Sequence, residues 1–291
     1  MTTGTPARDL GALLRVWRQR RRMSQLDLAI DANVSLKQLS CVETGRSQPS
    51  LQMLLDLATC LNVPLRDKNA LLSAAGFEPL FAERGFCTPE LGAVRRAVES
   101  VLAAHDPNPA LVIDRYWTML SANRAVAHLV AGAEPMLLRP PVNVIRLFLH
   151  PAGLAPRILN LAQWRTGMIA RLHRHTDLRD DPMVLNLLDE IRDYPSPHDN
   201  TVPNEVTDMI ASPFRLATCE GVLSFFCTTT LFDAPVDITV ADLSIEAFLP
   251  ADPETATYMR DIARGEKAGE DKAKSDTSRP SVPAQPAEAM V

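Results

Sequence analysis

Long apolar segments and the common catalytic motifs are missing from this sequence. No run of 18 apolar residues occurs and no charged-then-apolar leader opens the chain, so we expect a cytoplasmic protein with no membrane partner. It also lacks G-x-S-x-G, a glycine-rich phosphate loop and H-E-x-x-H. These absences predict that the chain is not an enzyme and carries no cofactor.

Metal-ligand spacing is missing too. The five cysteines are odd in number, scattered and never spaced as C-x-x-C, so neither a disulfide framework nor a zinc site is indicated. We interpret them as free or buried thiols. His173 and His175 lie two residues apart on a predicted helix and point about 200° away from each other. They cannot share a metal without unwinding that helix.

Two helix starts eleven residues apart are the clearest feature that is present. Ser24 with Asp27 and Ser35 with Gln38 each fit a capping box, in which a serine accepts from a backbone N–H and the third residue reaches back. Between them lies the bend 31–33, where Asn33 tolerates a left-handed backbone. We expect Leu26, Leu28, Ala29 and Ile30 to form the apolar face of the first helix, and Leu39 and Val42 that of the second. This spacing is typical of a helix-turn-helix.

A longer series of positions resembles the phage-repressor (XRE, Cro/CI-type) helix-turn-helix family. The matching residues are Leu13, Arg18, Ser24, Gln25, Leu28, Ala29, Val34, Ser35, Leu39, Val42, Glu43, Gly45, Pro49, Leu54, Leu55 and 61–64. Asn33 stands where the family most often has glycine, a mild change because asparagine is the next-best residue at positive φ. The resemblance implies an all-α bundle of five helices that binds double-stranded DNA. It also implies a buried ion pair between Arg18 and Glu43.

Charge is distributed unevenly along the chain. Residues 1–70 hold ten Lys and Arg against six Asp and Glu, a net charge of +4, although the whole chain is −5. A basic N-terminal segment on an acidic remainder predicts that the phosphate-facing surface lies at the N-terminus.

The predicted DNA contacts cluster at the second helix of the motif. By the resemblance, Gln25 binds a phosphate at a helix N-terminus. Lys37 can reach guanine, Leu36 can pack on a thymine methyl, and Gln38 either reads adenine or only completes its capping box. The full predicted set is Gln25, Ser35, Leu36, Lys37, Gln38, Ser40, Thr44 and Arg46. Such domains usually bind two half-sites, so we expect a homodimer on an inverted-repeat operator.

Behind this motif the pattern indicates two domains and a tail. We place the helix-turn-helix domain at 9–76, a connector at 77–88, a second domain at 89–264 and a disordered tail at 265–291. The fifth helix of the first domain is expected at 64–75, after a fourth that carries Leu51, Leu54, Leu55, Ala58 and Leu61 as core. In the second domain we expect helices at 89–104, 123–131, 156–175, 182–191 and 253–264, strands at 110–114, 117–121, 214–218, 221–231 and 238–249, and an apolar run at 144–149. This mixture predicts an α+β layered fold.

Residues 91–250 resemble the MmyB-like ligand-binding domain, a PAS-like fold found behind this kind of helix-turn-helix. The residues that carry the likeness are 109–114, Trp117, 122–125, 143–149, Trp164, Leu172, 181–182 and 187–188, whereas 194–209 lacks the family's aromatic segment. The resemblance implies a small apolar ligand, fatty-acid-like in character. Its predicted contacts are Trp117, Met119, Asn123, Phe148, Trp164, Met168 and Leu172, with Asn123, Arg146 and Arg165 as polar anchors. The same apolar positions equally fit a packed core.

The sequence therefore predicts a one-component transcription regulator, with repression favoured over activation. An alternative is a DNA-binding regulator whose second domain only dimerises or binds a protein partner and has no ligand. A third hypothesis is an enzyme fused to a DNA-binding head. A dry core would favour the second hypothesis, and a pocket holding a clustered acid, base or nucleophile would favour the third.

Overall fold

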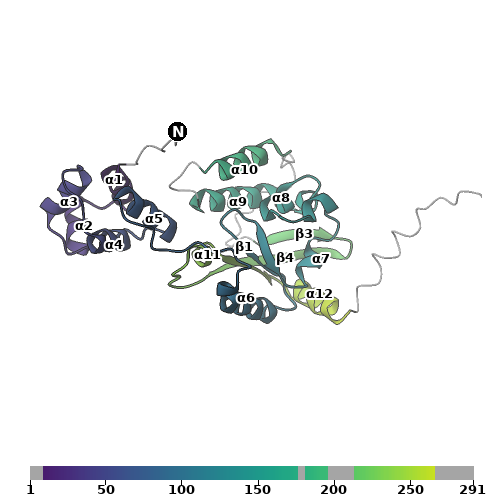
Figure 1. Ribbon diagram of the computed structural model, residues 1–291. Helices are drawn as coiled ribbons and strands as arrows, with labels where there is room; N and C mark the ends of the chain where they lie inside the picture. The colour runs from purple at the N-terminus through teal and green to yellow at the C-terminus, as the bar shows by residue number, and fades with distance from the viewer. Residues whose placement is uncertain (1–8, 176–180, 196–212, 266–291) are drawn as a thin grey trace, which may run out of the picture. The chain divides into compact units, whose positions relative to one another are not determined.

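The computed structural model describes residues 9–175, 181–195 and 213–265, and Figure 1 shows the helices and strands. The chain divides into two compact units. The first comprises the residues up to Glu99 together with Thr230–Ser244, and the second comprises Ser100–Thr229 together with the residues from Ile245 onward. The predicted disordered tail lies outside the described residues except for Gly265.

Five helices open the first unit, as the sequence predicted. They are α1 (Leu10–Arg20), α2 (Gln25–Asp31), α3 (Leu36–Glu43), α4 (Leu51–Cys60) and α5 (Leu65–Ala74). Both capping boxes form: the Ser24 hydroxyl accepts from Asp27 N and the Ser35 hydroxyl from Gln38 N, each at 3.1 Å. These caps satisfy N–H groups that a helix start leaves unpaired, which is why α2 and α3 begin where they do.

The core of this bundle takes one face of each helix. Its central members are Leu14, Leu28, Leu39, Val42, Leu54, Leu57, Ala58 and Leu61. Three predicted core positions are wrong, because Leu26, Ile30 and Leu51 are 54%, 67% and 37% exposed. Leu26 and Ile30 are four residues apart and share one helix face, while Leu28 points away from that face and is buried against the bundle, as is Ala29.

Two backbone features set the approach of α1, α2 and α3. Asn33 adopts φ +51°, the left-handed turn expected between α2 and α3. Gly11 allows α1 to lie directly against the end of α3, since a Cβ there would fall 2.2 Å from the Glu43 carbonyl oxygen. Any side chain at position 11 would push the two helices apart.

The segment after α5 contains no α-helix or strand until residue 89. Gly76, at φ +81°, ends the last turn of α5. The predicted helix at 89–104 consists of a 3-10 turn, η1 (Pro89–Leu91), followed by α6 (Gly92–Ala104). Proline at the first position suits η1 because its missing N–H has no partner there anyway.

A five-stranded sheet forms the centre of the second unit. The strands are β1 (Ala110–Ile113), β2 (Met119–Ala122), β3 (Phe214–Thr218), β4 (Gly221–Leu231) and β5 (Ser244–Pro250), in the order β2-β1-β5-β4-β3. The predicted hairpin is confirmed, with β1 and β2 antiparallel, and β3 pairs antiparallel with β4. Trp117 lies in the turn at φ +62° rather than in a strand.

One predicted strand is half wrong. Residues 238–249 were expected to be extended throughout, but Ile238–Ala241 forms the short helix α11 and only Ser244–Pro250 is strand β5. The Asp237 side chain accepts from Thr239 N at 2.9 Å and caps α11. This local side-chain bond competes with a strand, as aspartate at a helix start often does.

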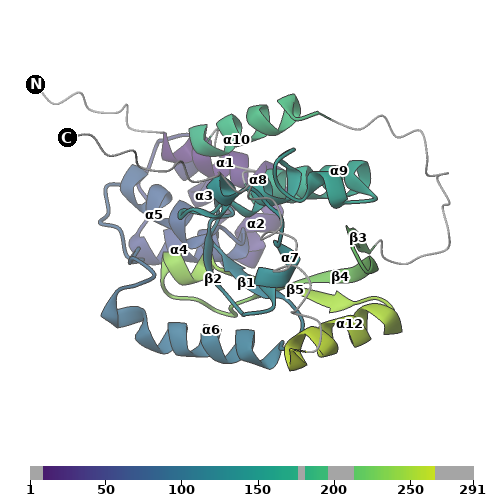
Figure 2. The same cartoon turned by 90° about the vertical axis from the view of Figure 1, so that its right-hand side faces the viewer.

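Helices cover both faces of the sheet. The remaining elements are α7 (Val126–Leu129), η2 (Pro135–Leu138), α8 (Val144–Leu149), η3 (Ala155–Arg157), α9 (Leu161–His175), α10 (Pro182–Asp193) and α12 (Pro253–Arg264). α8, α9 and α10 lie on one side and α12 on the other (Figures 1 and 2). The apolar run at 144–149 is thus helical, capped by Asn143, and α7 is shorter than the predicted 123–131. The α+β class predicted from sequence is confirmed.

Candidate DNA-binding surface and ligand cavity

The outward face of α3 is polar and open to solvent. Ser35, Leu36, Lys37 and Gln38 are exposed, while Leu39 and Val42 are buried against the bundle. Leu36 is 45% exposed, although it is apolar. An apolar side chain held in solvent beside a lysine suits contact with base edges, which offer both acceptors and methyl groups in the major groove.

A buried ion pair holds the end of α3 in place, as the family resemblance implied. Arg18 Nε donates to Glu43 Oε1 at 2.7 Å and Arg18 Nη2 to Glu43 Oε2 at 3.0 Å. Glu43 is 1% exposed. Burial alone would raise the pKa of its carboxyl, but the hydrogen bonds from Arg18 and Gln25 and the charges of Arg18 and Arg15 outweigh burial and lower that pKa.

Gln25 completes this buried cluster. Its Nε2 donates to Glu43 Oε2 at 2.7 Å. The sequence interpretation assigned that amide to a DNA phosphate, and the structure places it on a carboxylate inside the bundle. The amide nitrogen carries two hydrogens, so one N–H can position α3 through Glu43 while the other donates to a phosphate. The phosphate contact of Gln25 stays a prediction.

The two interpretations of Gln38 separate in the structure. Gln38 Oε1 accepts from Ser35 N at 3.2 Å and from the Ser35 hydroxyl at 2.9 Å. Bidentate recognition of adenine needs both the oxygen and the nitrogen of the amide. Because the oxygen is engaged, the structure favours the capping-box role.

The other predicted DNA contacts differ in how available they are. Ser40 is half-buried, and the Thr44 hydroxyl donates to the Ser40 carbonyl at 2.7 Å, which caps the end of α3. Arg46 is exposed. Arg21 plays a role that the sequence did not reveal: its Nε donates to Leu61 O at 2.8 Å and its Nη2 to Asn62 O at 2.9 Å, which ties α1 to the end of α4.

Most of the predicted ligand contacts pack into the core of the second unit. Trp117, Phe148, Met168 and Leu172 are each no more than 3% exposed, and Met119 packs against them. The Phe214 ring lies 5.4 Å from that of Phe148 and 4.7 Å from that of Trp164. Tilted contacts at such distances are those of a packed aromatic cluster.

A cavity nevertheless opens along α9. It has a volume of about 250 Å³ and is lined by Asn160, Gln163, Trp164, Gly167, Met168 and Arg171. Two of the predicted contacts, Trp164 and Met168, therefore border a space that a small molecule can enter. Gly167 contributes to that space, since nothing lies within 4 Å of where its Cβ would be.

The three predicted polar anchors are part of the scaffold. Asn123 Oδ1 accepts from Ala110 N at 3.1 Å, and its Nδ2 donates to Asn108 O at 2.8 Å and to Leu102 O at 3.2 Å. Arg165 Nη1 donates to the Tyr194 carbonyl at 3.0 Å. Neither lines the α9 cavity, so Asn123 and Arg165 are structural side chains here.

Arg146, the third anchor, pairs with a carboxylate of α10. Its Nη2 lies 2.7 Å from Glu190 Oε2. This hydrogen bond is the main reason that the pKa of Glu190 is lower than its ordinary value. The pair fastens α8 to α10 and leaves Arg146 outside the cavity lining.

The lining includes three polar side chains that the sequence interpretation missed, Asn160, Gln163 and the charged Arg171. Arg171 links the cavity to the sheet. Its Nη2 donates to Glu246 Oε1 at 2.5 Å and to the Thr229 hydroxyl at 2.7 Å, and its guanidinium lies 4.8 Å from the Trp117 ring centre. Glu246 is 4% exposed. From the sequence alone, an arginine at this position of a helix would be predicted to face solvent. Its contacts with β4 and β5 arise only from the tertiary fold.

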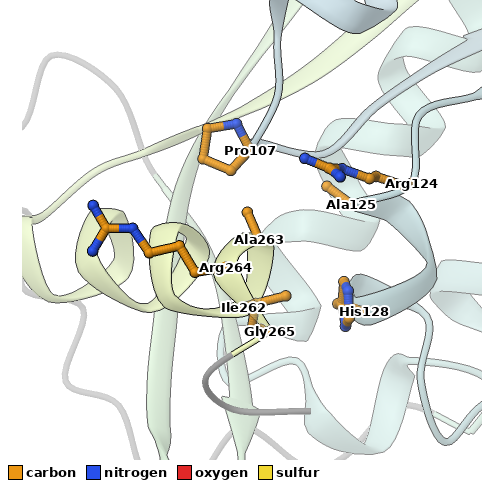
Figure 3. Close-up of a pocket in the computed structure, with 8 residues that line it drawn as sticks. All are labelled: Pro107, Arg124, Ala125, His128, Ile262, Ala263, Arg264 and Gly265. Atoms are coloured by element: carbon orange, nitrogen blue, oxygen red, sulfur yellow. The ribbon is translucent and has the colours of Figure 1, made fainter.

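A second cavity lies at the ends of α7 and α12. It has a volume of about 330 Å³ and is lined by Pro107, Arg124, Ala125, His128 and residues 262–265 (Figure 3). Arg124 also pairs with Asp106, with 3.4 Å between Nε and Oδ2. None of the predicted ligand contacts lines it.

Two negative findings apply to the residues that the structure describes. Within 9–175, 181–195 and 213–265, no group of three His, Cys, Asp or Glu side chains is placed to hold a metal ion. Over the same part of the chain, no helix combines the length and apolar character needed to cross a membrane.

Comparison with known proteins identifies both halves of the chain. Residues 94–261 match the family described as "MmyB-like transcription regulator ligand binding domain", and residues 9–71 match a "Helix-turn-helix domain" family. No curated protein matches the chain.

Two solved structures are similar to parts of the chain. The restriction-modification controller protein C.AhdI from Aeromonas hydrophila is 31% identical, over 21% of this chain and 94% of its own, with a TM-score of 0.20. The clp gene regulator ClgR from Corynebacterium glutamicum is 26% identical, over 36% of this chain and 99% of its own, with a TM-score of 0.22. With TM-scores this low, the assignment rests on the two family matches.

Proposed function

The chain belongs to the MmyB-like transcription regulators and carries a helix-turn-helix domain, and from this premise we propose that it represses transcription from an inverted-repeat operator in response to a small ligand. The two family matches show a DNA-binding regulator with a ligand-binding-type domain. The repressor role, the homodimer, the operator and an apolar, fatty-acid-like ligand are proposed.

The exposed face of α3 is the observation that supports operator binding most directly. Lys37 and Leu36 project from a helix whose other face is buried and whose end is clamped by Arg18 and Glu43. A helix that is held in place within a domain of net positive charge can enter the major groove, where its side chains contact the base edges. Two copies related by a two-fold axis would read two half-sites about one helical turn apart.

The α9 cavity supports the ligand. Its lining includes the apolar side chains of Trp164 and Met168 and the guanidinium of Arg171. Such a lining suits a ligand with an apolar chain and an acidic group at one end, because ligand pockets are mostly apolar with a few polar groups that orient the ligand. The close packing of Trp117, Phe148 and Leu172 supports the alternative instead, in which the second unit only dimerises or binds a protein partner without a ligand.

We also infer that the chain acts without catalysis. The Cys227 thiol lies near the Arg171 and Glu246 pair, and burial, followed by the charge of Glu246, raises its pKa well above the ordinary value. A thiol held in its protonated form is a poor nucleophile.

Fluorescence anisotropy with DNA from upstream of the protein's own gene tests the DNA-binding proposal. We expect Lys37→Ala to weaken binding ~10-fold, in line with the loss of one good base contact, and Arg46→Ala to reduce the slope of log Kd against log salt by ~1 through one lost phosphate. Arg192→Ala, an exposed arginine of the second unit, is the matched control.

Each outcome bears on a different part of the proposal. Unchanged affinity in Lys37→Ala would remove α3 as the recognition helix. Absence of binding to any DNA by the folded wild type would favour a protein-partner role. Repeating the titration with a panel of straight-chain fatty acids tests the ligand, and Gly167→Leu, which fills the α9 cavity, should abolish any response while leaving DNA affinity intact.

A further inference from the structure

The connection between β4 and β5 forms a strap on the DNA-binding unit. Residues Thr230–Ser244 join two neighbouring strands of the sheet, yet they cluster with the first unit. The strap contains α11, which contacts α5. Ile238, Val240 and Leu243 of the strap are buried, so the attachment has an apolar core.

Ion pairs fasten this strap to the first unit. Arg66 of α5 donates from Nη2 to Asp242 Oδ2 at 2.9 Å and from Nη1 to Glu83 Oε2 at 2.6 Å. Arg84 Nη1 donates to Asp237 Oδ2 at 2.5 Å, and Asp237 is 4% exposed. A buried carboxylate that loses its cation is strongly unfavourable, so these pairs resist separation of the strap from α5.

Hydrogen bonds that involve the backbone also join the strap, the connector and α5. Ile238 N donates to Ala82 O at 2.8 Å, and the Thr239 hydroxyl donates to Arg84 O at 2.5 Å. On the other side of the connector, Asn69 of α5 accepts from Leu80 N at 3.0 Å and donates to Phe81 O at 2.7 Å. The connector is thus hydrogen-bonded both to α5 and to the strap.

Arg171 binds residues next to both ends of this strap. The chain passes between the units after Glu99, after Thr229 and after Ser244. Thr229 is the last residue before the strap, Glu246 is the second residue after Ser244, and the Arg171 guanidinium binds both. The Thr229 hydroxyl also donates to Glu246 Oε1 at 3.0 Å, so one polar cluster, of which Glu246 is the buried member, joins β4 to β5.

We propose that the strap Thr230–Ser244 transmits occupancy of the α9 cavity to the DNA-binding unit, with Arg171 as the positioning residue that senses the occupant. This inference rests on the proposed function, because it requires a ligand in that cavity. Arg171 lines the cavity, and its bonds to Glu246 and Thr229 both come from Nη2. In this proposal an acidic occupant turns the guanidinium toward itself, so that Nη2 leaves both partners. Glu246 without that cation is a buried, poorly compensated charge, and the ends of β4 and β5 rearrange to relieve it.

The coupling follows from the covalent connection. A ligand shifts an equilibrium only through different affinities for two arrangements. Here the two arrangements are Arg171 bound to Glu246 and Thr229, or Arg171 bound to the ligand. Because Asp237 and Asp242 hold the strap on Arg84 and Arg66, displacement of the strand ends is carried to α5 and the helices packed on it.

Hydrogen–deuterium exchange on the full chain tests this proposal without a ligand. Arg171→Met removes the sensing group, and we expect faster exchange, by ~5-fold or more, in peptides covering 230–244 and α5. Glu246→Gln should give the same pattern, and serves if Arg171→Met fails to fold. Arg192→Met, which removes an exposed pair with Asp189, is the control and should leave both regions unchanged.

A double variant separates coupling from general loosening. Asp242→Asn removes the direct ion pair between the strap and Arg66 of α5, so adding Arg171→Met to it should still speed exchange in β4 and β5 but speed it less in α5. Unchanged exchange in 230–244 and α5 in folded Arg171→Met and Glu246→Gln proteins would overturn the proposal, as would an α5 response that Asp242→Asn leaves undiminished.

The exchange and anisotropy experiments together distinguish failure of the proposed strap coupling from failure of the proposed ligand. A wild-type operator affinity that responds to the fatty-acid panel, in a protein without Arg171-dependent exchange, would retain the proposed function and remove the strap. Exchange coupling without any response to the panel would retain the strap and remove those acids as effectors.

Discussion

Each unit contains a buried arginine–glutamate pair, and the two pairs differ in what surrounds the arginine. In the first unit, Arg18 and Glu43 are 12% and 0% exposed at their side chains, and Gln25 adds a third hydrogen bond. In the second, Arg171 and Glu246 are 22% and 5% exposed, and Arg171 borders a cavity. The first pair has only scaffold partners and stabilises the position of α3. In the second pair a ligand can reach the arginine, so the same kind of ion pair is suited to respond to ligand binding.

The largest expected effect breaks the first pair. Arg18→Met leaves the Glu43 carboxylate buried without its cation, and we expect a loss of ~3–5 kcal/mol in the stability of the first unit. Urea dependence of hydrogen exchange in α1 and α3 peptides measures it. The exposed Arg192→Met should change stability by less than ~0.5 kcal/mol. A similar small change in Arg18→Met would remove the claim that this pair clamps α3.

The second prediction sharpens the contrast between scaffold and cavity in the second unit. Asn123→Ala removes three hydrogen bonds to backbone groups, and at ~1 kcal/mol each we expect a loss of ~2–4 kcal/mol. Exchange in β1 peptides reports the loss. If Asn123 were a ligand anchor, the variant would keep its stability and weaken only the response to added fatty acids.

Acid should weaken the first pair with a defined sign. The Glu43 pKa is lowered on folding despite its burial, because Arg18 and Gln25 donate to the carboxylate. The resulting stability is fully present above the unfolded pKa of about 4.3 and is lost as pH falls through the lower folded value. We therefore expect α1 and α3 to lose protection below about pH 5, and Glu43→Gln to flatten this dependence. An equally steep curve in Glu43→Gln would contradict it.

The smallest effect concerns the start of α3. Ser35→Ala removes the acceptor for Gln38 N, and loss of such a cap costs ~1 kcal/mol. Ser47→Ala, an exposed serine outside any helix, is the control. Thermal unfolding followed by circular dichroism compares them, and equal melting temperatures would mean that the capping box contributes no net stability.

Local signals in the first unit were sufficient to predict most of its structure. The two capping boxes, the asparagine at positive φ and the Arg18–Glu43 pair all follow from residues close in sequence or at positions shared with a known family. Leu26 and Ile30 were misplaced because apolar residues around a short helix do not reveal which face the neighbouring helices will cover. Leu51 lies on the same face as Leu54 and Ala58 but is the first residue of α4, at the end of the helix.

The second unit was less predictable because its site depends on distant segments. The strands at 214–218 and 221–231 were predicted with the right bounds, since alternation and turn residues mark them. The α11 helix was missed because an aspartate cap outweighed an apolar run. The predicted ligand contacts include core residues as well as residues that line the cavity. The sequence does not distinguish the two groups, because both are apolar and lie on the same helices.

By itself the sequence determined the helix starts, the DNA-binding motif, the family and the α+β class, because these depend on hydrogen bonds and periodicities within a few turns of chain. Only the tertiary structure decided that Gln25 joins Glu43, that Asn123 clamps backbone, and that Arg171 meets Glu246 and Thr229 beside a cavity. Those contacts join residues 13 to 75 positions apart. Which side chains meet over such separations is decided by how the sheet and helices pack.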